Sequence, residues 1–343
     1  MPEREESVSP QDLRDVVQKI LQRYRTPAQV AEKVAHVLVD ADCTGYPSHG
    51  VALLEGYLKD IADEKLDPAG IAFVKDTASG ALHADAQNGW GHAGLIDLAV
   101  RVRAQARVAG ICIGTLVNAS HIGRMGYYVE LLSRDGCIGM GTTASAFMPD
   151  HALVSATGEP ERHLGSNPFA AAFPVEDHDS FVFDASTAAV SYFKLRQTQM
   201  TGQLLETPAL IATSQMSSYD PAAFDAGGAI RPESGHKGLG ASIVSSLLCA
   251  LGKGAQIEER IRGTTIIAID PETVSPGFSA QCGMFLEALA NLPFSQGIPG
   301  WRAAARRREA EAQGIRLGAQ VISVLSREIE ELGLPIPKFL QRP

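Results

Sequence analysis

Two segments near the start of the chain show the spacing of amphipathic helices. Apolar residues recur every three or four positions from Leu13 to Leu21 and again from Val30 to Leu38, which places one apolar stripe along each helix. Ser9-Pro10 and Thr26-Pro27 precede these segments, and a hydroxyl residue followed by proline is typical of a capped helix start. We therefore predict two N-terminal helices with apolar faces that need a partner, and a third helix over 49–62.

The middle of the chain has a different texture. From 71 to about 270, short runs of β-branched residues alternate with helical patterns, which is typical of an α/β domain. The expected strands cover 111–116, 138–143, 181–183 and 264–269, and the clearest helices cover 94–107 and 238–251.

The C-terminal part is helical again, because Val321, Leu325, Ile329 and Leu332 form another apolar stripe. Helices from both ends of the chain could cover one another. We predict a discontinuous helical domain from residues 1–70 and 295–343, and an α/β domain from residues 71–294 that binds cofactor and substrate.

Composition excludes several classes of partner. The 343 residues are 45% hydrophobic and carry a net charge of −9, which repels a nucleic-acid backbone. The longest apolar stretches are far shorter than the ~20 residues that a bilayer span needs. The polar, acidic start shows no secretory signal, so we expect a cytoplasmic protein that binds neither nucleic acid nor membrane. Five widely spaced cysteines indicate reduced thiols, and no motif with metal-ligand spacing occurs, so we expect no metal.

Glycine motifs narrow the possible folds. The string Gly-x-Gly-x-x-Gly, which marks a Rossmann dinucleotide site, does not occur in this chain. The reversed spacing occurs twice. We interpret Gly136 to Gly141 as turn glycines, whereas Gly235 to Gly240 contains Lys237 just before an apolar helix. A cation and free backbone N–H groups there could hold a pyrophosphate.

Three segments carry candidate catalytic groups, each with a structural alternative. Ser48 and His49 enter a helix, but neighbouring side chains diverge, so the pair could equally be a helix cap. His121 follows an apolar strand, a usual position for catalysis, and could instead cap the next helix. Asp184 ends a short strand and could orient a histidine or cap a helix.

Taken together, these segments resemble the type-2, non-Rossmann malate/L-lactate dehydrogenase family, which includes ureidoglycolate, hydroxycarboxylate and sulfolactate dehydrogenases and piperideine-2-carboxylate ketimine reductases. The match spans about 41–314. It rests on Ser48-His49-Gly50, Ser120-His121-Ile-Gly, Leu164-Gly-Ser-Asn-Pro168, Asp184-Ala-Ser-Thr187 with Lys194, Gly235-His-Lys-Gly238, and Pro299-Gly300 with the arginines after it.

The resemblance implies a homodimer with a helical domain made from both termini and an unusual, mixed-sheet NAD(P)-binding domain. Members bind NAD or NADP and reduce a 2-oxo acid or a cyclic ketimine reversibly. By this resemblance His49 would donate or accept the proton, oriented by Ser48 and Asp184, or His121 would take that role.

Cofactor contacts are expected from both the motifs and the chemistry of a dinucleotide. The candidate cofactor-binding residues are His121, Gly123, Ser145, Glu176, Lys237, Gly300 and Arg302. Glu176 or its neighbour Asp177 could accept a hydrogen bond from a ribose 2′-OH and would repel a 2′-phosphate, which favours NAD.

The substrate end departs from the family pattern. Many members carry arginine four residues after the Ser-His histidine, where it pairs with the substrate carboxylate, and here that position is Leu53. We expect Arg124 to make this contact instead, with Asn167 also near the substrate. The leading interpretation is a 2-hydroxy/2-oxo acid dehydrogenase. The alternatives are a ketimine reductase acting on a cyclic imino acid and a catalytically silent relative.

Overall fold

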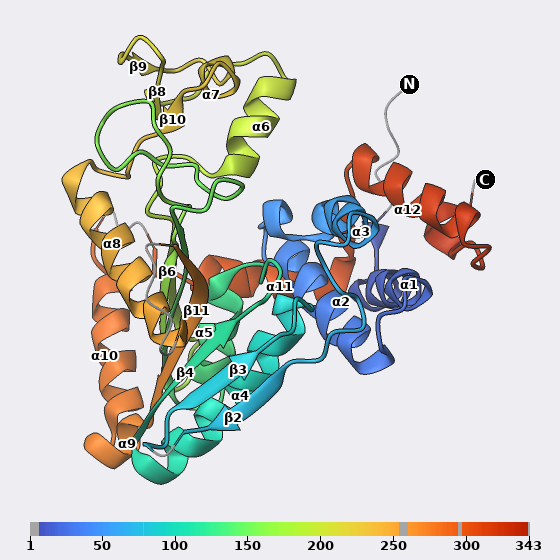
Figure 1. Ribbon diagram of the computed structural model, residues 1–343. Helices are drawn as coiled ribbons and strands as arrows, with labels where there is room; N and C mark the ends of the chain where they lie inside the picture. Colours follow the sequence, from blue (N-terminus) through green and yellow to red (C-terminus); the bar gives the residue numbers. More distant parts are fainter. Residues whose placement is uncertain (1–6, 78, 254–259, 294–296, 342–343) are drawn as a thin grey trace.

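The computed structural model describes residues 7–77, 79–253, 260–293 and 297–341. A seven-stranded mixed sheet forms the centre of the molecule (Figure 1). In spatial order its strands are β2 (Phe73–Asp76), β3 (Leu82–Asp85), β4 (Ile111–Val117), β11 (Ile261–Ile269), β5 (Ile138–Ala146), β6 (Phe169–Phe173) and β7 (Phe181–Ala185). Only β3 and β4 pair in parallel within it; every other neighbouring pair is antiparallel.

Helices cover both faces of this sheet. α4 (Gly91–Ala109) and α5 (Met125–Arg134) pack on one face, whereas α8 (His236–Ala250) packs on the other, against β5 and β11. α10 (Phe278–Ala290) lies on the same side as α8 in Figure 1, after the short α9 (Pro271–Val274). The α5 face approaches the sheet closely, since a Cβ on Gly139 would lie 2.6 Å from the Val129 carbonyl. This packing explains Gly139, and Gly141 lies against Met125 of α5 in the same way. The predicted turn glycine is Gly136, with φ +81°, whereas Gly139 and Gly141 belong to strand β5.

A small lobe stands beyond the end of the sheet, at the top of Figure 1. It contains α6 (Tyr192–Met200), α7 (Ala222–Asp225) and a three-stranded sheet in the order β10 (Ala229–Ile230), β8 (Leu210–Ile211), β9 (Ser217–Ser218). Its own apolar core includes Val154, Leu195 and Phe224.

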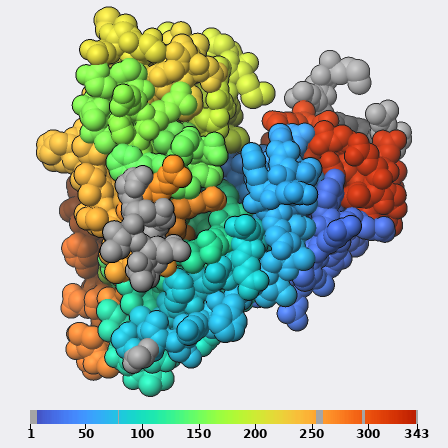
Figure 2. All heavy atoms as spheres, viewed as in Figure 1, coloured from blue at the N-terminus to red at the C-terminus, as the bar shows by residue number. Residues whose placement is uncertain are grey.

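Both ends of the chain build one helical lobe. It contains α1 (Pro10–Arg23), α2 (Ala28–Cys43), α3 (Leu54–Ala62), α11 (Trp301–Gln313) and α12 (Ala319–Glu331). The strands β1 (Ser7–Val8) and β12 (Ile315–Arg316) pair antiparallel and tie the two ends together. Figure 2 shows the blue N-terminal and red C-terminal atoms gathered in this lobe.

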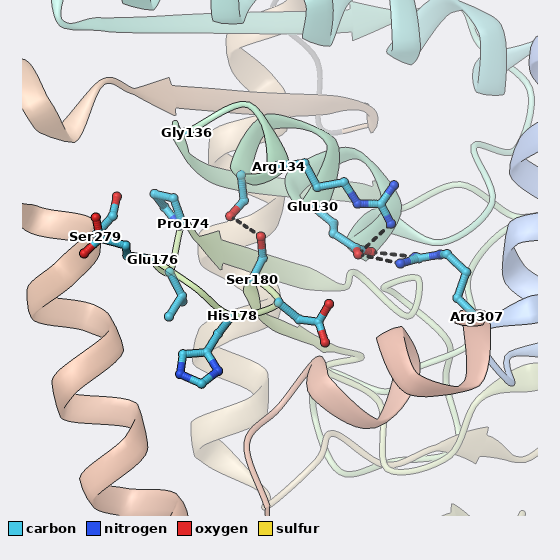
Figure 3. Close-up of a pocket in the computed structure, with 12 residues that line it drawn as sticks. Glu130, Arg134, Gly136, Pro174, Glu176, His178, Ser180, Ser279 and Arg307 are labelled. Carbon is cyan, nitrogen blue, oxygen red and sulfur yellow. Dashed lines mark hydrogen bonds and ion pairs between the residues drawn. The ribbon is translucent and has the colours of Figure 1, made fainter. Parts of the chain in front are cut away.

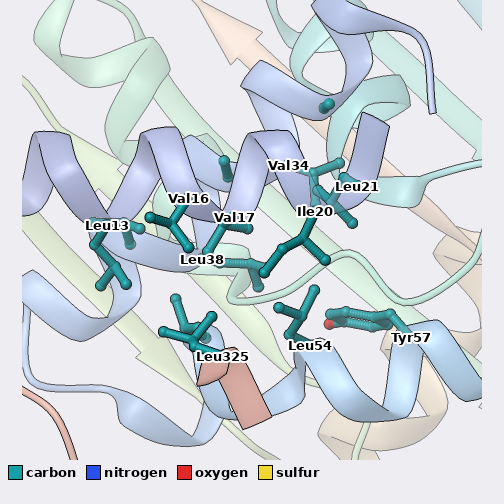
Figure 4. Close-up of a cluster of buried hydrophobic side chains, with 14 of the residues drawn as sticks. Leu13, Val16, Val17, Ile20, Leu21, Val34, Leu38, Leu54, Tyr57 and Leu325 are labelled. Carbon is teal, nitrogen blue, oxygen red and sulfur yellow. The ribbon is translucent and has the colours of Figure 1, made fainter. Parts of the chain in front are cut away.

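The core of the helical lobe draws on the apolar stripes seen in the sequence. Leu13, Val17, Ile20 and Leu21 of α1 meet Val34 and Leu38 of α2, Leu54 of α3 and Leu325 of α12 (Figure 4). Burial of these side chains supplies most of the driving force for joining the two termini.

The fold class predicted from the sequence is confirmed: an α/β chain with a mixed sheet and helices from both termini packed together. The domain boundaries at 70/71 and 294/295 stay a prediction. Ser9 caps α1 as expected by accepting from the Asp12 N–H at 3.0 Å. Thr26 does not cap α2; its hydroxyl instead accepts from Trp90 Nε1 at 3.2 Å.

The third predicted helix begins later than expected. Residues 47–53 form two 3-10 turns, Pro47–His49 and Val51–Leu53, and the regular helix α3 covers only Leu54–Ala62. The extended Gly50 between the two turns breaks the helical path.

Leu325→Ala is expected to destabilise the fold by about 2–5 kcal/mol, because Leu325 is fully buried among side chains of the N-terminal helices and its truncation leaves a cavity. Urea unfolding followed by circular dichroism measures the change. Ile336→Ala, at a 59% exposed position, is the control and should leave the stability nearly unchanged. Equal effects of the two variants would contradict a shared core of both termini.

Candidate active site

The Ser48-His49 turn is built over a carboxyl group. Asp42, near the end of α2, accepts a hydrogen bond from the Val51 N–H at 2.9 Å. A Cβ on Gly50 would lie 2.1 Å from Asp42 Oδ1, so only glycine fits between the turn and this carboxyl group. Burial raises the pKa of Asp42 to about 7.

Ser48 and His49 do interact, contrary to the expectation that neighbouring side chains diverge. The tight 3-10 turn brings Ser48 Oγ to 2.9 Å from His49 Nδ1. This hydrogen bond orients the imidazole through Nδ1, so the second ring nitrogen of His49, Nε2, takes no part in it. The sequence pattern alone did not predict this geometry because it depends on the local backbone.

The structure brings His49 and His121 together. His121 lies in the loop between β4 and α5, and its ring stacks on that of His49 with centroids 6.0 Å apart and planes 24° apart. His121 does not cap the following helix, whose N-cap is Arg124. The histidine of the helical lobe thus faces the histidine of the α/β part.

Two residues that the sequence analysis missed stand behind His121. The Tyr57 hydroxyl, on α3, lies 2.7 Å from His121 Nδ1 and 3.4 Å from Nε2 of His92, on α4. Tyr57 is 5% exposed and also packs edge-on against Trp90. In the sequence, Tyr57 belongs to an apolar stripe and His92 opens a helix, so neither pattern distinguished a polar contact from ordinary packing.

Both facing histidines are neutral near pH 7. Desolvation, followed by the Arg124 charge, lowers the pKa of His49 to about 4. Desolvation, followed by the charge of His49, lowers the pKa of His121 to about 3. His121 also keeps exposed surface, and solvent there opposes part of this shift.

Arg124 lies inside a group of charges where the two parts of the molecule meet. It is 5% exposed, and its guanidinium is within 3.7–4.0 Å of carboxylate oxygens of Asp40, Glu130 and Asp184. Arg307 of α11 reaches both Asp40, at 2.8 Å, and Glu130, at 2.9 Å. We call these five residues the charge cluster.

Asp184 belongs to the charge cluster and does not hydrogen-bond to His49 within the described residues. Its carboxylate accepts from the Gly126 N–H at 2.7 Å. Burial raises the pKa of Asp184, while Arg124 and the Gly126 N–H oppose that shift. The expected direct orientation of His49 by Asp184 is therefore not seen among the described contacts; Arg124, 4.0 Å from Asp184, is the member of the charge cluster that acts on His49.

Asn167 is buried and connects the sheet to α8 through hydrogen bonds. Its Oδ1 accepts from the Ser145 N–H at 3.0 Å, and its Nδ2 donates to the hydroxyls of Ser242, at 2.9 Å, and Ser246, at 3.1 Å. These contacts use both ends of the amide. Asn167 therefore positions Ser145, at the end of β5, and α8, the helix whose first turn carries Lys237.

The two candidate glycines make close contacts. Gly123 has φ +74°, and a Cβ there would lie 3.2 Å from His92. Gly300 has φ +95° just before α11, and a Cβ would lie 2.7 Å from the Val182 backbone nitrogen. Both positions favour glycine for reasons of packing and backbone conformation.

The charged cofactor candidates lie on the surface. Lys237 is exposed in the first turn of α8. A Cβ on Gly235 or Gly240 would meet no other segment, whereas one on Gly238 would lie 2.1 Å from the Glu233 carbonyl oxygen, so the helix start is open except where Glu233 covers Gly238. Arg302 is exposed in the first turn of α11.

Glu176 borders a hollow of about 410 Å³ together with Pro174, His178, Ser279, Arg134 and Arg307. Figure 3 shows Arg307 and Arg134 directed at Glu130, with Glu176 and His178 on the opposite side of the hollow. Both arginines are engaged with Glu130, and His178 and Asp179 are paired with Glu287 and Arg308, so Glu176 and the serine hydroxyls are the remaining polar side chains of this hollow.

A further cation lies beside the histidine pair. Arg262, at the exposed end of β11, donates from Nη2 to the Ala119 carbonyl at 3.1 Å, two residues before His121. Its charge contributes to lowering the pKa of His121. Leu53, where an arginine was expected, is partly buried and packs on the helical core.

Comparison with known proteins agrees with this architecture. The malate/L-lactate dehydrogenase family model matches residues 8–326. A Δ1-pyrroline-2-carboxylate/Δ1-piperideine-2-carboxylate reductase of Pseudomonas putida is 27% identical over 92% of this chain and 94% of its own. The L-sulfolactate dehydrogenase of Methanocaldococcus jannaschii is 26% identical over 97% and 99%.

Solved structures show the same fold. A malate dehydrogenase from Entamoeba histolytica superposes with a TM-score of 0.88 at 20% identity, covering 97% of this chain and 99% of that one. Dehydrogenases of this family use nicotinamide cofactors. No helix within the described residues is long and apolar enough to cross a membrane. The chain belongs to the malate/L-lactate dehydrogenase family and is an oxidoreductase acting on hydroxy or oxo acids or their imine counterparts.

Proposed function

We propose that this protein transfers a hydride between a nicotinamide dinucleotide and a small 2-oxo or 2-hydroxy acid. The observation that carries the proposal is the stacked pair of His49 and His121, two neutral imidazoles brought from different parts of the chain to one place. A histidine is suited to exchange a proton with a substrate oxygen near neutral pH.

The described residues fit a dinucleotide. The open first turn of α8 offers Lys237 and backbone N–H groups for the pyrophosphate. Ser145, positioned by Asn167, and the exposed Arg302 are further donors. Gly123 and Gly300 adopt positive φ values and allow close backbone packing at their positions. Glu176, at the rim of the hollow in Figure 3, would accept from a ribose 2′-OH and disfavour a 2′-phosphate.

The chemistry assigned to the protein is proton transfer and orientation. A bound nicotinamide would supply or accept the hydride. During oxidation neutral His49, oriented by Ser48 at 2.9 Å, takes the proton of the substrate hydroxyl and becomes imidazolium; during reduction it must first be protonated to imidazolium, and that proton then goes to the substrate oxygen. His121, whose ring stacks on that of His49, contacts the same substrate oxygen. Without a proton, reduction would leave an alkoxide unstabilised.

Two cations are candidates for holding the substrate carboxylate. Arg124 was expected in this role, and its Nε and Nη2 donate to none of the described residues, although three carboxylates lie 3.7–4.0 Å away. At 5% exposure it is less accessible to a substrate than the exposed Arg262. Arg262 lies beside the loop that carries His121. It forms no ion pair with a described residue, and the charge of Asp60 acts on it only from a distance. We propose Arg262 as the main carboxylate contact, with Arg124 setting the electrostatics of His49.

A ketimine reductase remains the second candidate. The relative from Pseudomonas putida is named for reduction of cyclic imino acids and aligns over nearly the whole chain. The same pair of histidines could protonate an imine nitrogen as readily as a carbonyl oxygen. A catalytically silent subunit is less consistent with the ordered Ser48, His49, Tyr57 and His121 contacts.

We further propose a cytoplasmic homodimer. On α8 the buried face consists of small residues such as Ser242 and Ser246, whereas Ile243, Val244 and Leu247 are 45–63% exposed. Phe285 on α10 is also exposed, at 59%. A second copy of this chain would cover this apolar surface. The free thiols of the chain favour a reducing compartment.

Purified protein is expected to oxidise NADH in the presence of small 2-oxo acids, faster than with piperideine-2-carboxylate and faster than with NADPH. Loss of absorbance at the reduced nicotinamide band measures each rate. Higher activity with the cyclic imino acid would establish the second candidate. Failure of every acid and imine to react, with either dinucleotide, would contradict both.

The rate of hydroxy-acid oxidation should be insensitive to pH from about 5 to 8. Oxidation needs neutral His49 as base, and because its pKa is lowered to about 4, the base is present throughout this range and is lost only as the pH falls through that value. kcat/KM measured against pH, with circular dichroism to confirm folding, tests this. A fall in kcat/KM below pH 6.5 would show an ordinary histidine instead.

Arg262→Gln is expected to raise the substrate KM about 10- to 100-fold without lowering the melting temperature, because an exposed charged contact is lost. Arg124→Gln, the matched variant, should lower stability by about 3–5 kcal/mol, because buried carboxylates lose their partner. Steady-state kinetics and thermal unfolding compare the two. A folded Arg124→Gln protein with high KM beside an unaffected Arg262→Gln protein would restore Arg124 to the substrate.

A further inference from the structure

The direction of the hydrogen bonds around His121 can be worked out from one backbone donor. The Gly123 N–H points at His121 Nδ1, at 3.3 Å. A backbone N–H can only donate, so Nδ1 must accept and carries no proton. A neutral imidazole with Nδ1 unprotonated holds its proton on Nε2. The lowered pKa of His121 agrees with the neutral form.

The Tyr57 hydroxyl extends this order by one step. Its oxygen lies 2.7 Å from His121 Nδ1, and because Nδ1 is an acceptor, the hydroxyl hydrogen of Tyr57 is donated to it; this shorter bond shares the single Nδ1 lone pair with the longer one from the Gly123 N–H. The hydroxyl has no second hydrogen. It can therefore only accept from His92 Nε2, 3.4 Å away, which must carry the proton of that ring.

His92 begins the chain of hydrogen bonds. It is fully buried, and its Nδ1 has no hydrogen-bond partner among the described residues, as expected for the unprotonated nitrogen of a neutral ring. Desolvation, together with His121 and His49, lowers the pKa of His92 well below its ordinary value. A fully buried imidazole beside two other imidazoles stays neutral, because burial disfavours its charged form.

We propose that Tyr57 is a positioning residue that holds His121 in the Nε2–H tautomer, through a hydrogen-bond chain running from His92 Nε2 through the Tyr57 hydroxyl to His121 Nδ1. His121 then presents a fixed N–H donor to the substrate oxygen. The tautomer follows from the protein alone, whereas the contact with substrate rests on the proposed function.

This hydrogen-bond chain gives His121 and His49 different roles. Protonation of His121 at Nδ1 would break its hydrogen bonds from Tyr57 and Gly123, so His121 stays neutral and polarises the substrate oxygen by donation. His49 is different, because the Ser48 hydroxyl at its Nδ1 can rotate to donate or to accept. His49 can therefore gain and lose a proton, and it is the group that gives the proton to the substrate.

Imidazole nitrogen shifts test the tautomers without any substrate. In 15N-labelled protein at pH 7, long-range 1H–15N correlation spectra should show His121 and His92 each with Nε2 protonated and Nδ1 unprotonated, with signals assigned from His121→Gln and His92→Gln. A proton on Nδ1 of either ring in the unmodified protein would overturn the proposal. This measurement needs no folded Tyr57 variant.

Tyr57→Phe then tests the positioning role. We expect the His121 signals to move toward a mixture of tautomers, and kcat to fall about tenfold or more with little change in dinucleotide affinity. Tyr127→Phe is the matched control, a tyrosine that is 8% exposed and whose hydroxyl makes no hydrogen bond with described residues. Unchanged His121 shifts in Tyr57→Phe would overturn the role of Tyr57.

The two proposals fail in different ways. If the tautomers are as expected but no acid or imine is reduced, the proposed function is wrong and the hydrogen-bond chain stands. If substrates are reduced but His121 carries its proton on Nδ1, the proposed function stands and the proposed hydrogen-bond chain is wrong.

Discussion

The site depends on one contact between two separately built cores. Tyr57 belongs to the core of the helical lobe, and its hydroxyl meets His121, which follows a strand of the central sheet. His49 is carried by the same lobe as Tyr57 and stacks on His121 from its side of the junction. A shift of the lobe against the sheet would therefore move both groups away from His121 together.

The charge cluster holds the same junction at a second point. Asp40 and Arg307 come from helices of the lobe, while Arg124, Glu130 and Asp184 come from the α/β part. Opposite charges at 5–15% side-chain exposure attract strongly, but they were desolvated to reach this place, so the cluster specifies a geometry more than it adds stability. Within this cluster Arg124 lies close enough to His49 to add to the lowering of its pKa by burial.

Much of the fold could be predicted from periodicity, because it records burial directly. The stripes from Leu13 to Leu21 and from Val321 to Ile329 both proved to face one shared core, and the β-branched runs became central strands. The details that depend on backbone geometry could not be predicted. The 3-10 turn that joins Ser48 to His49 and the loss of a cap at Thr26 are both of this kind.

The candidate site was predicted only in part, for a related reason. Motifs identified His49 and His121, but partners contributed by distant segments, such as Tyr57 and His92, lie within patterns that also describe ordinary cores. For Arg124 the motif predicted a substrate contact, which stays a prediction, but it gave no sign of the carboxylates, distant in sequence, that lie around this side chain in the fold. Pairwise contacts of this kind leave no periodic signal.

A crystal structure with reduced dinucleotide and an unreactive 2-oxo acid analogue would examine the central claim most directly. The account predicts the analogue's oxo oxygen within hydrogen-bond distance, about 3 Å, of Nε2 of both His49 and His121, beside the nicotinamide ring. An analogue bound elsewhere, with neither imidazole in contact with its oxo oxygen, would contradict it.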